Sequence, residues 1–328
     1  MTDDRWSVEQ AASWYHQLPW LVGCNFTPST AINQLEMWQS ETFDPQTIDK
    51  ELGWAESLGF TTARVYLHDL VWQNDPQGFK QRIDRFLSIA SRHAIKPLFV
   101  IFDDCWDQHP ASGAQRAPKP GVHNSGWVQS PGTDIVLDPS KWTRLAAYVA
   151  DILTAFGSDD RILLWDLYNE PGNNDLGERT LPLLQAAFAW ARGAKPSQPL
   201  SVGVWSDNQK INDFILSASD VITFHNYEDA ESLRRQIDRL KNYHRPLICT
   251  EYMARTRSSR FETHLPIFKN EHIGCINWGL VSGKTQTIFP WGSPEGSPEP
   301  GEWFHDIFRP DGTPYRQSEV DFIRSILK

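Results

Sequence analysis

The chain has 328 residues, of which 40% are hydrophobic, enough for one domain of barrel size or for two ordinary domains. It holds 41 acidic and 31 basic residues, so its formal net charge is −10, and the two signs are mixed along the chain rather than gathered in blocks. This pattern argues against nucleic acid or an anionic membrane as a partner, and a neutral or cationic small ligand fits better.

The beginning of the sequence favours a cytoplasmic protein. Its first residues are acidic where a secretory signal carries positive charge, and no unbroken apolar run follows. No stretch approaches the roughly 20 apolar residues of a membrane span. The four cysteines show no metal-ligand spacing, and three lie in apolar runs, so we expect them to be reduced and buried. A chain whose leader had been removed would look the same.

Short apolar runs recur along the chain, and each is followed by a loop and a segment with helical spacing. The predicted strands are 20–26, 62–67, 97–102, 162–168, 200–205, 221–227, 246–252 and 274–280. The predicted helices between and after them are 45–59, 78–93, 139–156, 178–193, 208–219, 230–244 and 259–272, with a last one after Tyr315. Another helix is expected at about 7–16.

Eight alternations of strand and helix, without a glycine-rich phosphate turn, predict a closed (β/α)8 TIM barrel of the α/β class. The strands are apolar throughout, which is typical of parallel strands buried on both faces. We see no linker, so we expect one domain over 1–328, with the helix at about 7–16 covering the barrel floor. The long loops 103–138 and 282–314 follow strand ends and contain Trp, so we expect them to wall a pocket.

Fifteen tryptophans are an unusual number, and several fall in segments that resemble loops: Trp38, Trp106, Trp127, Trp291 and Trp303. The ordinary role of Trp is to fill the core. In a loop, however, its flat apolar face and single N–H suit a ligand that is apolar on its faces and hydroxylated at its rim. A sugar ring is such a ligand, and Trp106, Trp127 and Trp291 are candidate contacts.

Two glutamates stand where predicted strands end. Glu170 follows the strand 162–168 and precedes Pro171, and Glu251 lies near the end of the strand 246–252. Both would lie at the carboxyl rim of a barrel, where barrel enzymes keep their active sites. Cleaving an acetal needs one carboxylic acid for the leaving oxygen and one carboxylate for the anomeric carbon. Strand alternation would send Asn169 and Glu170 to opposite faces, so the strand must bulge or end there.

Other side chains fit beside this pair. Arg64 lies in an apolar strand, where a charge must be paired, and a carboxylate such as Glu251 would pair with it. His225 and Tyr227 carry donors that could orient the pair, and Trp278 could be the floor on which a sugar stacks.

These motifs resemble the retaining glycoside hydrolases of clan A, of the cellulase and mannanase type grouped as family 5. The resemblance rests on "NEP" in strand four, "HNY" in strand six, and the Arg, Glu and Trp of strands two, seven and eight, and it spans about 20–283. It implies that Glu170 is the general acid/base, Glu251 the nucleophile and Asn169 a donor to the 2-hydroxyl, with Arg64, His225 and Tyr227 in support. The loop 102–132 departs from the family pattern, so the substrate is not implied.

Two further aspartates, Asp103 and Asp104, could bind sugar hydroxyls or a metal. The histidines are scattered and none has metal-binding spacing, so we expect no metal and no cofactor. Asp166, in mid-strand, is more simply a buried carboxylate satisfied by the barrel interior.

The function expected from the sequence is that of a retaining β-glycosidase on β-linked oligosaccharides, exo-acting or specific for short chains. The mechanism requires Glu170 to have a raised pKa and Glu251 to stay ionised. An endo-acting hydrolase or a transglycosylase would use the same residues, and a non-catalytic sugar-binding barrel would keep the tryptophans. A Schiff-base lyase needs a pocket lysine, whereas the only strand lysine, Lys96, lies at the wrong end. The sugar, the linkage and the oligomeric state stay open.

Overall fold

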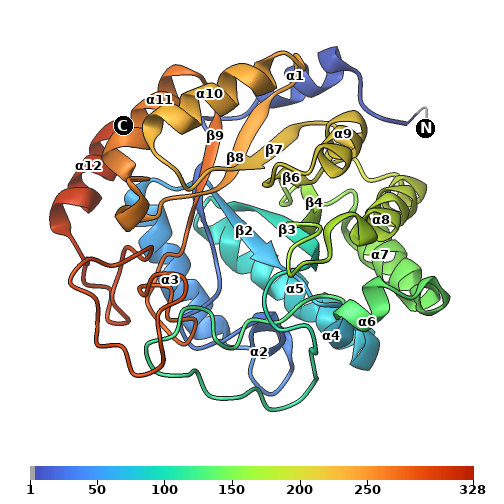
Figure 1. Cartoon of the computed structure of the whole chain (residues 1–328), viewed down its shortest axis with the longest axis horizontal. Helices are drawn as coiled ribbons and strands as arrows, with labels where there is room; N and C mark the ends of the chain where they lie inside the picture. Colours follow the sequence, from blue (N-terminus) through green and yellow to red (C-terminus); the bar gives the residue numbers. More distant parts are fainter. Residues whose placement is uncertain (1–3) are drawn as a thin grey trace.

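The computed structural model describes residues 4–328, and its strands form one parallel sheet that wraps into a barrel (Figure 1). The sheet order is β5-β4-β3-β2-β1-β9-β8-β7-β6. The strands are β1 (Val22–Asn25), β2 (Thr62–Tyr66), β3 (Lys96–Asp103), β4 (Trp165–Asn169), β5 (Leu200–Ser201), β6 (Gly203–Val204), β7 (Ile222–His225), β8 (Leu247–Tyr252) and β9 (Gly274–Trp278).

The fifth predicted strand is divided in two. β5 pairs with β4 and β6 pairs with β7, while only Val202 separates β5 from β6 in the chain. The two short strands therefore form one segment that closes the barrel. The predicted α/β barrel is confirmed, and the eight apolar runs form its strands.

Helices surround the barrel, in the places that the helical spacing predicted and in short additions within loops (Figure 1). They are α1 (Val8–His16), α2 (Gln34–Trp38), α3 (Pro45–Leu58), α4 (Asp69–Asn74), α5 (Pro76–Arg92), α6 (Thr133–Val136), α7 (Trp142–Phe156), α8 (Leu181–Ala194), α9 (Gln209–Ala218), α10 (Ala230–Lys241), α11 (Phe261–Asn270) and α12 (Gln317–Leu327). Short 3-10 turns occupy Pro139–Lys141, Gly177–Thr180 and Arg255–Arg257. Within residues 4–328, no helix combines the length and apolar character needed to cross a membrane.

The amino end of the barrel is plugged by α1. Ala11 and the partly buried Trp14 of this helix pack on residues just before strands or within their first three positions, which are Leu21, Leu98, Leu163, Leu164, Val221, Ile248 and Ile276. Burying a large apolar side chain stabilises the fold by about 1.5–3 kcal/mol. The plug leaves the carboxyl end as the open mouth of the barrel.

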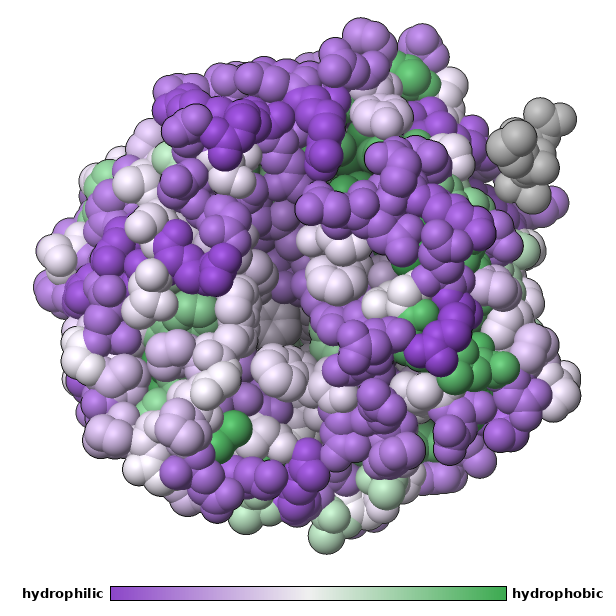
Figure 2. All heavy atoms as spheres, in the orientation of Figure 1, coloured by the Kyte–Doolittle hydropathy of each residue, from purple (hydrophilic) through white to green (hydrophobic). Residues whose placement is uncertain are grey.

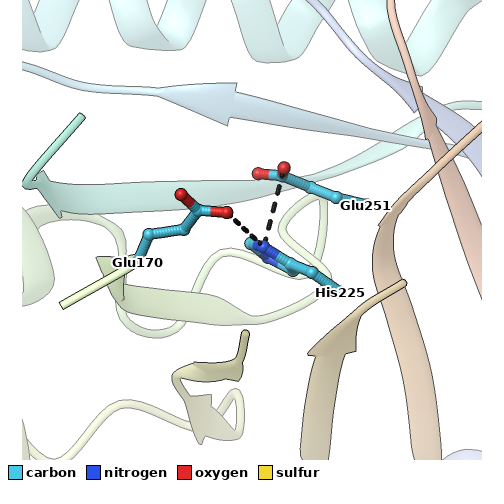
Figure 3. Close-up of side chains that lie close together, drawn as sticks. All are labelled: Glu170, His225 and Glu251. Atoms are coloured by element: carbon cyan, nitrogen blue, oxygen red, sulfur yellow. Dashed lines mark hydrogen bonds and ion pairs between the residues drawn. The ribbon is translucent and has the colours of Figure 1, made fainter. Parts of the chain in front are cut away.

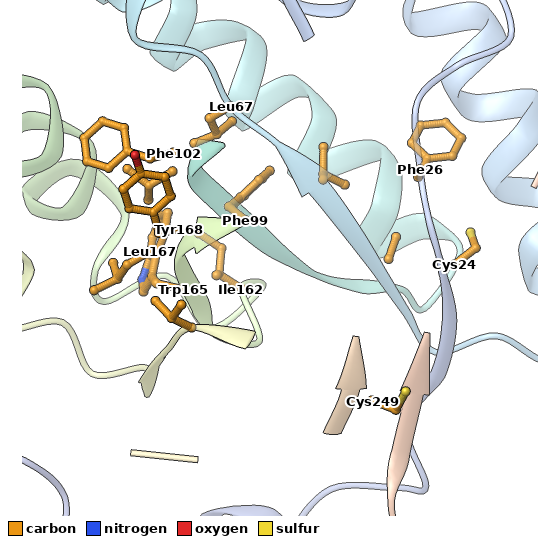
Figure 4. Packing of buried hydrophobic residues seen from close by; sticks show 14 of the residues in the cluster. Cys24, Phe26, Leu67, Phe99, Phe102, Ile162, Trp165, Leu167, Tyr168 and Cys249 are labelled. Atoms are coloured by element: carbon orange, nitrogen blue, oxygen red, sulfur yellow. The ribbon is translucent and has the colours of Figure 1, made fainter. Parts of the chain in front are cut away.

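A second apolar layer fills the space between strands and outer helices. Phe99, Phe102, Trp165, Leu167 and Tyr168 belong to this layer on β3 and β4 (Figure 4). Two tryptophans expected in loops belong to the interior as well. Trp38 ends α2 and is 0% exposed, and Trp303 is 1% exposed and stacks on Tyr315 at 4.6 Å. Neither is available to a ligand.

The two long loops meet over one side of the mouth. Asn124 N donates to Thr285 O at 2.8 Å, and Gly296 N donates to Pro120 O at 2.8 Å. Gly121 has φ +78, and a Cβ atom there would lie 2.5 Å from the backbone nitrogen of Ser297, so only glycine fits this crossing. Loops 103–138 and 282–314 thus form one continuous wall.

Candidate active site

A cavity of about 790 Å³ opens at the carboxyl end of the barrel, a size usual for small-ligand sites. Figure 2 shows the hollow near the centre of this face, bordered largely by hydrophilic residues. Both long loops contribute to it, and so do residues at or after the carboxyl ends of β4, β6, β7, β8 and β9. The tryptophans that line it are Trp106, Trp127, Trp205, Trp278 and Trp291.

The end of β4 explains how two neighbouring side chains reach one cavity. β4 ends at Asn169, and Glu170 follows with φ +45, in the left-handed region that a glutamate rarely adopts. Such a conformation costs on the order of 1–3 kcal/mol and persists where its surroundings enforce it. Because the backbone reverses at this point, both Asn169 and Glu170 line the cavity.

Glu251 on β8 is held by hydrogen-bond donors at both oxygens. Its Oε1 accepts from Arg64 Nη1 at 2.6 Å and from the Tyr66 hydroxyl at 3.0 Å, and its Oε2 accepts from the Tyr227 hydroxyl at 2.7 Å. Burial and the charge of Glu251 raise the pKa of Tyr227, so this phenol keeps its proton. The donors stabilise the ionised form of the carboxylate.

Arg64 is fully buried and divides its charge between two carboxylates. Besides Glu251, it donates to Asp166 Oδ2 from Nε at 2.9 Å and from Nη2 at 2.7 Å. Its Nη2 also donates to Asn169 Oδ1 at 2.7 Å, and its Nη1 to Asn25 Oδ1 at 3.0 Å. The structure therefore places Asp166 in the barrel interior as expected, and it brings Arg64, Asn169 and Glu251 together.

His225, at the end of β7, lies between the two glutamates (Figure 3). Its Nδ1 is 3.0 Å from Glu170 Oε1 and 3.6 Å from Glu251 Oε2. One ligand atom from each of these three residues lies within 4.8 Å of the others, so the set could hold a metal ion, whereas the sequence predicted none. The two carboxylates face one gap between β4 and β8.

The pKa of Glu170 differs in direction from the sequence expectation. Burial alone raises the pKa of this carboxyl, but the hydrogen bond and charge of His225, with bonds from Cys105 and Asn173, outweigh it and lower the pKa. The prediction of a raised pKa was therefore wrong for this structure. The expectation considered the effect of burial on the pKa of Glu170 but not the effect of the contact with His225.

Three residues that contact the two glutamates were missed in the sequence. Cys105 Sγ is 3.3 Å from Glu170 Oε2, and Asn173 Nδ2 donates to the same oxygen at 2.7 Å. Tyr66 supports Glu251, as described above. Asn173 lies three residues after Glu170 in a tight turn, and that spacing could have identified it. Nothing in the sequence around Cys105 indicated its place.

The structure contradicts the expectation that Asp103 and Asp104 bind substrate. Both are at most 1% exposed, and neither lines the cavity. Asp103 accepts from Trp127 Nε1 at 2.7 Å and from Asn169 Nδ2 at 2.9 Å, while Asp104 accepts from the Tyr168 hydroxyl at 2.6 Å. Both lie behind the wall, where Asp103 orients Trp127 and Asn169, which do face the cavity.

The aromatic candidates divide by exposure. Trp106 and Trp291 are 41% and 39% exposed at the rim, and Trp127 is 2% exposed deeper in the wall. Trp278 is half-buried and packs edge-on against Tyr66 and Trp127, at 6.0 and 6.1 Å between ring centroids. All four line the cavity where the sequence expected a sugar.

The cavity is closed on one side and open on the other. Among the described residues, none before Cys105 lines it, and behind Trp127 and Trp278 lies only a space of about 20 Å³. On the other side it extends past Trp205 to α10, where Arg235 and Arg239 line it.

Comparison with known proteins gives one family match. Residues 121–283 match the profile of the family described as Cellulase (glycosyl hydrolase family 5). A search of curated proteins finds no significant match.

Solved structures share the fold at low sequence identity. A GH5_18 variant from Streptomyces cattleya in complex with Manβ1-4GlcNAc has a TM-score of 0.64 and 13% identity, over 93% of this chain and 80% of that one. An exo-β-1,4-mannosidase from Opitutaceae bacterium strain TAV5 has a TM-score of 0.62 and 17% identity, over 94% of this chain and 60% of that one. An endo-1,4-β-D-mannanase from Thermotoga petrophila RKU-1 has a TM-score of 0.60 and 15% identity, over 94% of this chain and 99% of that one.

Proposed function

We propose that this chain, a glycoside hydrolase that resembles family 5 of clan A, cleaves β-linked glycosides with retention of configuration. One observation carries the proposal, namely that an oxygen of Glu170 and an oxygen of Glu251 lie within 4.8 Å of each other. Retaining enzymes keep their carboxyl groups about 5–5.5 Å apart, whereas inverting enzymes leave about 6.5–9.5 Å for a water molecule.

In the first step, Glu251 attacks the anomeric carbon while Glu170 transfers a proton to the leaving oxygen. The carbon–oxygen bond of the aglycone breaks as an ester to Glu251 forms. In the second step, Glu170 takes a proton from water, and the water oxygen displaces Glu251. Asn169, with its amide fixed by Asp103 and Arg64, would donate to the 2-hydroxyl of the sugar.

The surroundings of the two glutamates suit these steps. Arg64, Tyr66 and Tyr227 stabilise Glu251 as the carboxylate that attacks and later leaves. The lowered pKa of Glu170 favours the ionised form, which the second step needs. For the first step, substrate binding must separate Glu170 from His225 or place the proton between them, since the free pair favours ionised Glu170.

We propose exo action on a terminal sugar. A pocket closed beyond Trp127 and Trp278 admits one end of a chain, and the leaving group then extends past Trp205 toward α10. The matched solved structures are described as both an exo-mannosidase and an endo-mannanase, so their names alone do not decide. A cytoplasmic location, expected from the sequence, would supply short oligosaccharides rather than polymers.

The test is a panel of aryl β-hexosides and β-linked disaccharides, including β-mannosides, with the anomer of the first product followed by NMR. We expect the β-anomer first and release of single sugars from the non-reducing end. Production of the α-anomer would exclude the double displacement, and internal cleavage of oligosaccharides would indicate endo action. If added sugars intercept the intermediate more readily than water, the chain is a transglycosylase. Absence of turnover with every glycoside would favour a sugar-binding barrel.

A further inference from the structure

Two histidines from the two long loops lie together in the closed end of the pocket. His123 and His305 line the cavity, are 3% and 0% exposed, and have ring centroids 5.4 Å apart. The ring of His305 is 5.7 Å from that of Tyr227 and 6.5 Å from that of Trp278. Tyr227 bonds to Glu251, so this pair borders the place where the sugar being cleaved must lie.

The hydrogen bonds of the two rings determine where their protons are. His123 Nδ1 is 2.8 Å from Phe289 O, and His305 Nδ1 is 2.5 Å from Met253 O. A carbonyl oxygen only accepts, so each Nδ1 must carry the hydrogen. In a neutral ring with hydrogen on Nδ1, Nε2 is a bare acceptor.

Both rings are held neutral. Burial lowers the pKa of His123 to about 4 and lowers the pKa of His305 well below its usual range, where the nearby His123 and Arg255 act in the same direction. No described carboxylate forms an ion pair with either ring. His305 Nε2 is buried and has no hydrogen-bond partner among the described residues. An unsatisfied buried acceptor is costly, so a hydroxyl group that donated to this atom would be bound favourably.

We infer that His123 and His305 select the terminal sugar by accepting hydrogen bonds from its hydroxyl groups. A neutral hexose supplies O–H donors at this end of the pocket. A carboxylate or phosphate at the same position has only acceptor oxygens, which two bare Nε2 atoms repel. A glycone with a carboxylate or phosphate at the position that these rings contact is therefore excluded. This inference rests on the proposed exo-glycosidase function.

The experiment uses the full chain and the aryl β-hexoside that is turned over best. Where the rings contact the 6-hydroxyl, the matching aryl β-uronide should have a kcat/KM lower by about 100-fold or more, because its carboxylate leaves the buried acceptors unpaired. A series of monodeoxy hexosides then identifies the hydroxyl group from which each ring accepts a hydrogen bond. We expect His305→Phe and His123→Phe to lower kcat/KM for the parent by about 10-fold or more. On the analogue lacking the hydroxyl concerned, the same variants should change kcat/KM little.

His305→Gln is the conservative variant, because its amide oxygen keeps an acceptor near the position of Nε2, and we expect it to retain more activity than His305→Phe. Thermal unfolding of each variant identifies a folding defect. If His305→Phe does not fold, the inference is tested by the kcat/KM values of His123→Phe and by those of the wild type on the deoxy analogues. Equal losses on the parent and on all deoxy analogues would overturn the inference while leaving the glycosidase proposal intact. Failure of the wild type on every glycoside would remove both.

Discussion

The mouth of the barrel has two unlike walls. Strand ends supply charged groups that are bonded to one another, with Arg64 between Asp166 and Glu251. The two long loops supply neutral rings, with His123 and His305 fixed by main-chain carbonyl oxygens. Under the proposed function, charge is concentrated where the glycosidic bond breaks, and neutral acceptors face the terminal sugar. The proposal therefore assigns the chemistry to the rigid strands and the selection of the sugar to the loops.

The largest expected effect comes from removing Glu251, the proposed nucleophile. Glu251→Ala should lower kcat by about 10⁴-fold or more, because loss of a nucleophile removes the covalent pathway. Azide added to this variant should occupy the vacated space and give the α-glycosyl azide by a single displacement. Product NMR checks this. A β-glycosyl azide would instead assign Glu251 to the other role and Glu170 to attack.

The charged wall should also be the one on which stability depends. Arg64→Met leaves Asp166 and Glu251 buried without their partner, and we expect the free energy of unfolding to fall by about 3–5 kcal/mol. Urea unfolding measures the change. The control is Lys210→Met, which breaks the exposed ion pair with Glu178 and should cost at most about 1 kcal/mol. Equal losses in the two variants would mean that the buried Arg64 network contributes no more to the free energy of unfolding than an exposed ion pair does.

His225 links the two glutamates, and its removal should shift the pH profile. The general acid works only when protonated, so kcat/KM falls as the pH rises through the pKa of Glu170 in the free enzyme. His225 lowers that pKa, so in His225→Ala the pKa rises and the basic limb should move to higher pH. The exposed His16→Ala serves as control and should leave the profile in place. A basic limb that moves to lower pH would contradict the assigned direction.

The charged wall could be predicted from the sequence because strand ends converge by geometry. Eight apolar runs fix the barrel, and the polar residues at or near the ends of those runs must then meet at one rim. This logic identified Glu170, Glu251, Arg64, His225 and Tyr227 as neighbours, as the structure places them. It did not identify which atom of His225 bridges the pair, and so the direction of the Glu170 pKa was missed.

The neutral wall could not be predicted in the same way. Loops 103–138 and 282–314 have no period, and their shape depends on bonds between segments far apart, such as Gly121 N to Gln286 Oε1 at 2.9 Å. No pattern in the sequence therefore indicated that His123 and His305 line the cavity. The sequence pattern was misleading for Asp103 and Asp104, because loop carboxylates next to tryptophans were expected to reach the sugar. Asp103 still belongs to β3, and both side chains bond within the wall.

Cys105 stands where the two walls join, and it provides the smallest test. Its thiol donates to Glu170 Oε2 at 3.3 Å, while burial raises the pKa of the thiol and keeps it protonated. Because Asn173 and His225 also hold Glu170, Cys105→Ala should lower kcat/KM by only about 2- to 10-fold, as expected for one weak hydrogen bond. Cys105→Ser, which keeps a donor, should recover part of the loss, and Cys24→Ala is the matched buried control. If the alanine variant loses activity as completely as Glu251→Ala, then the loop holds the general acid in place, and the division between a strand-built chemistry and a loop-built selection no longer stands.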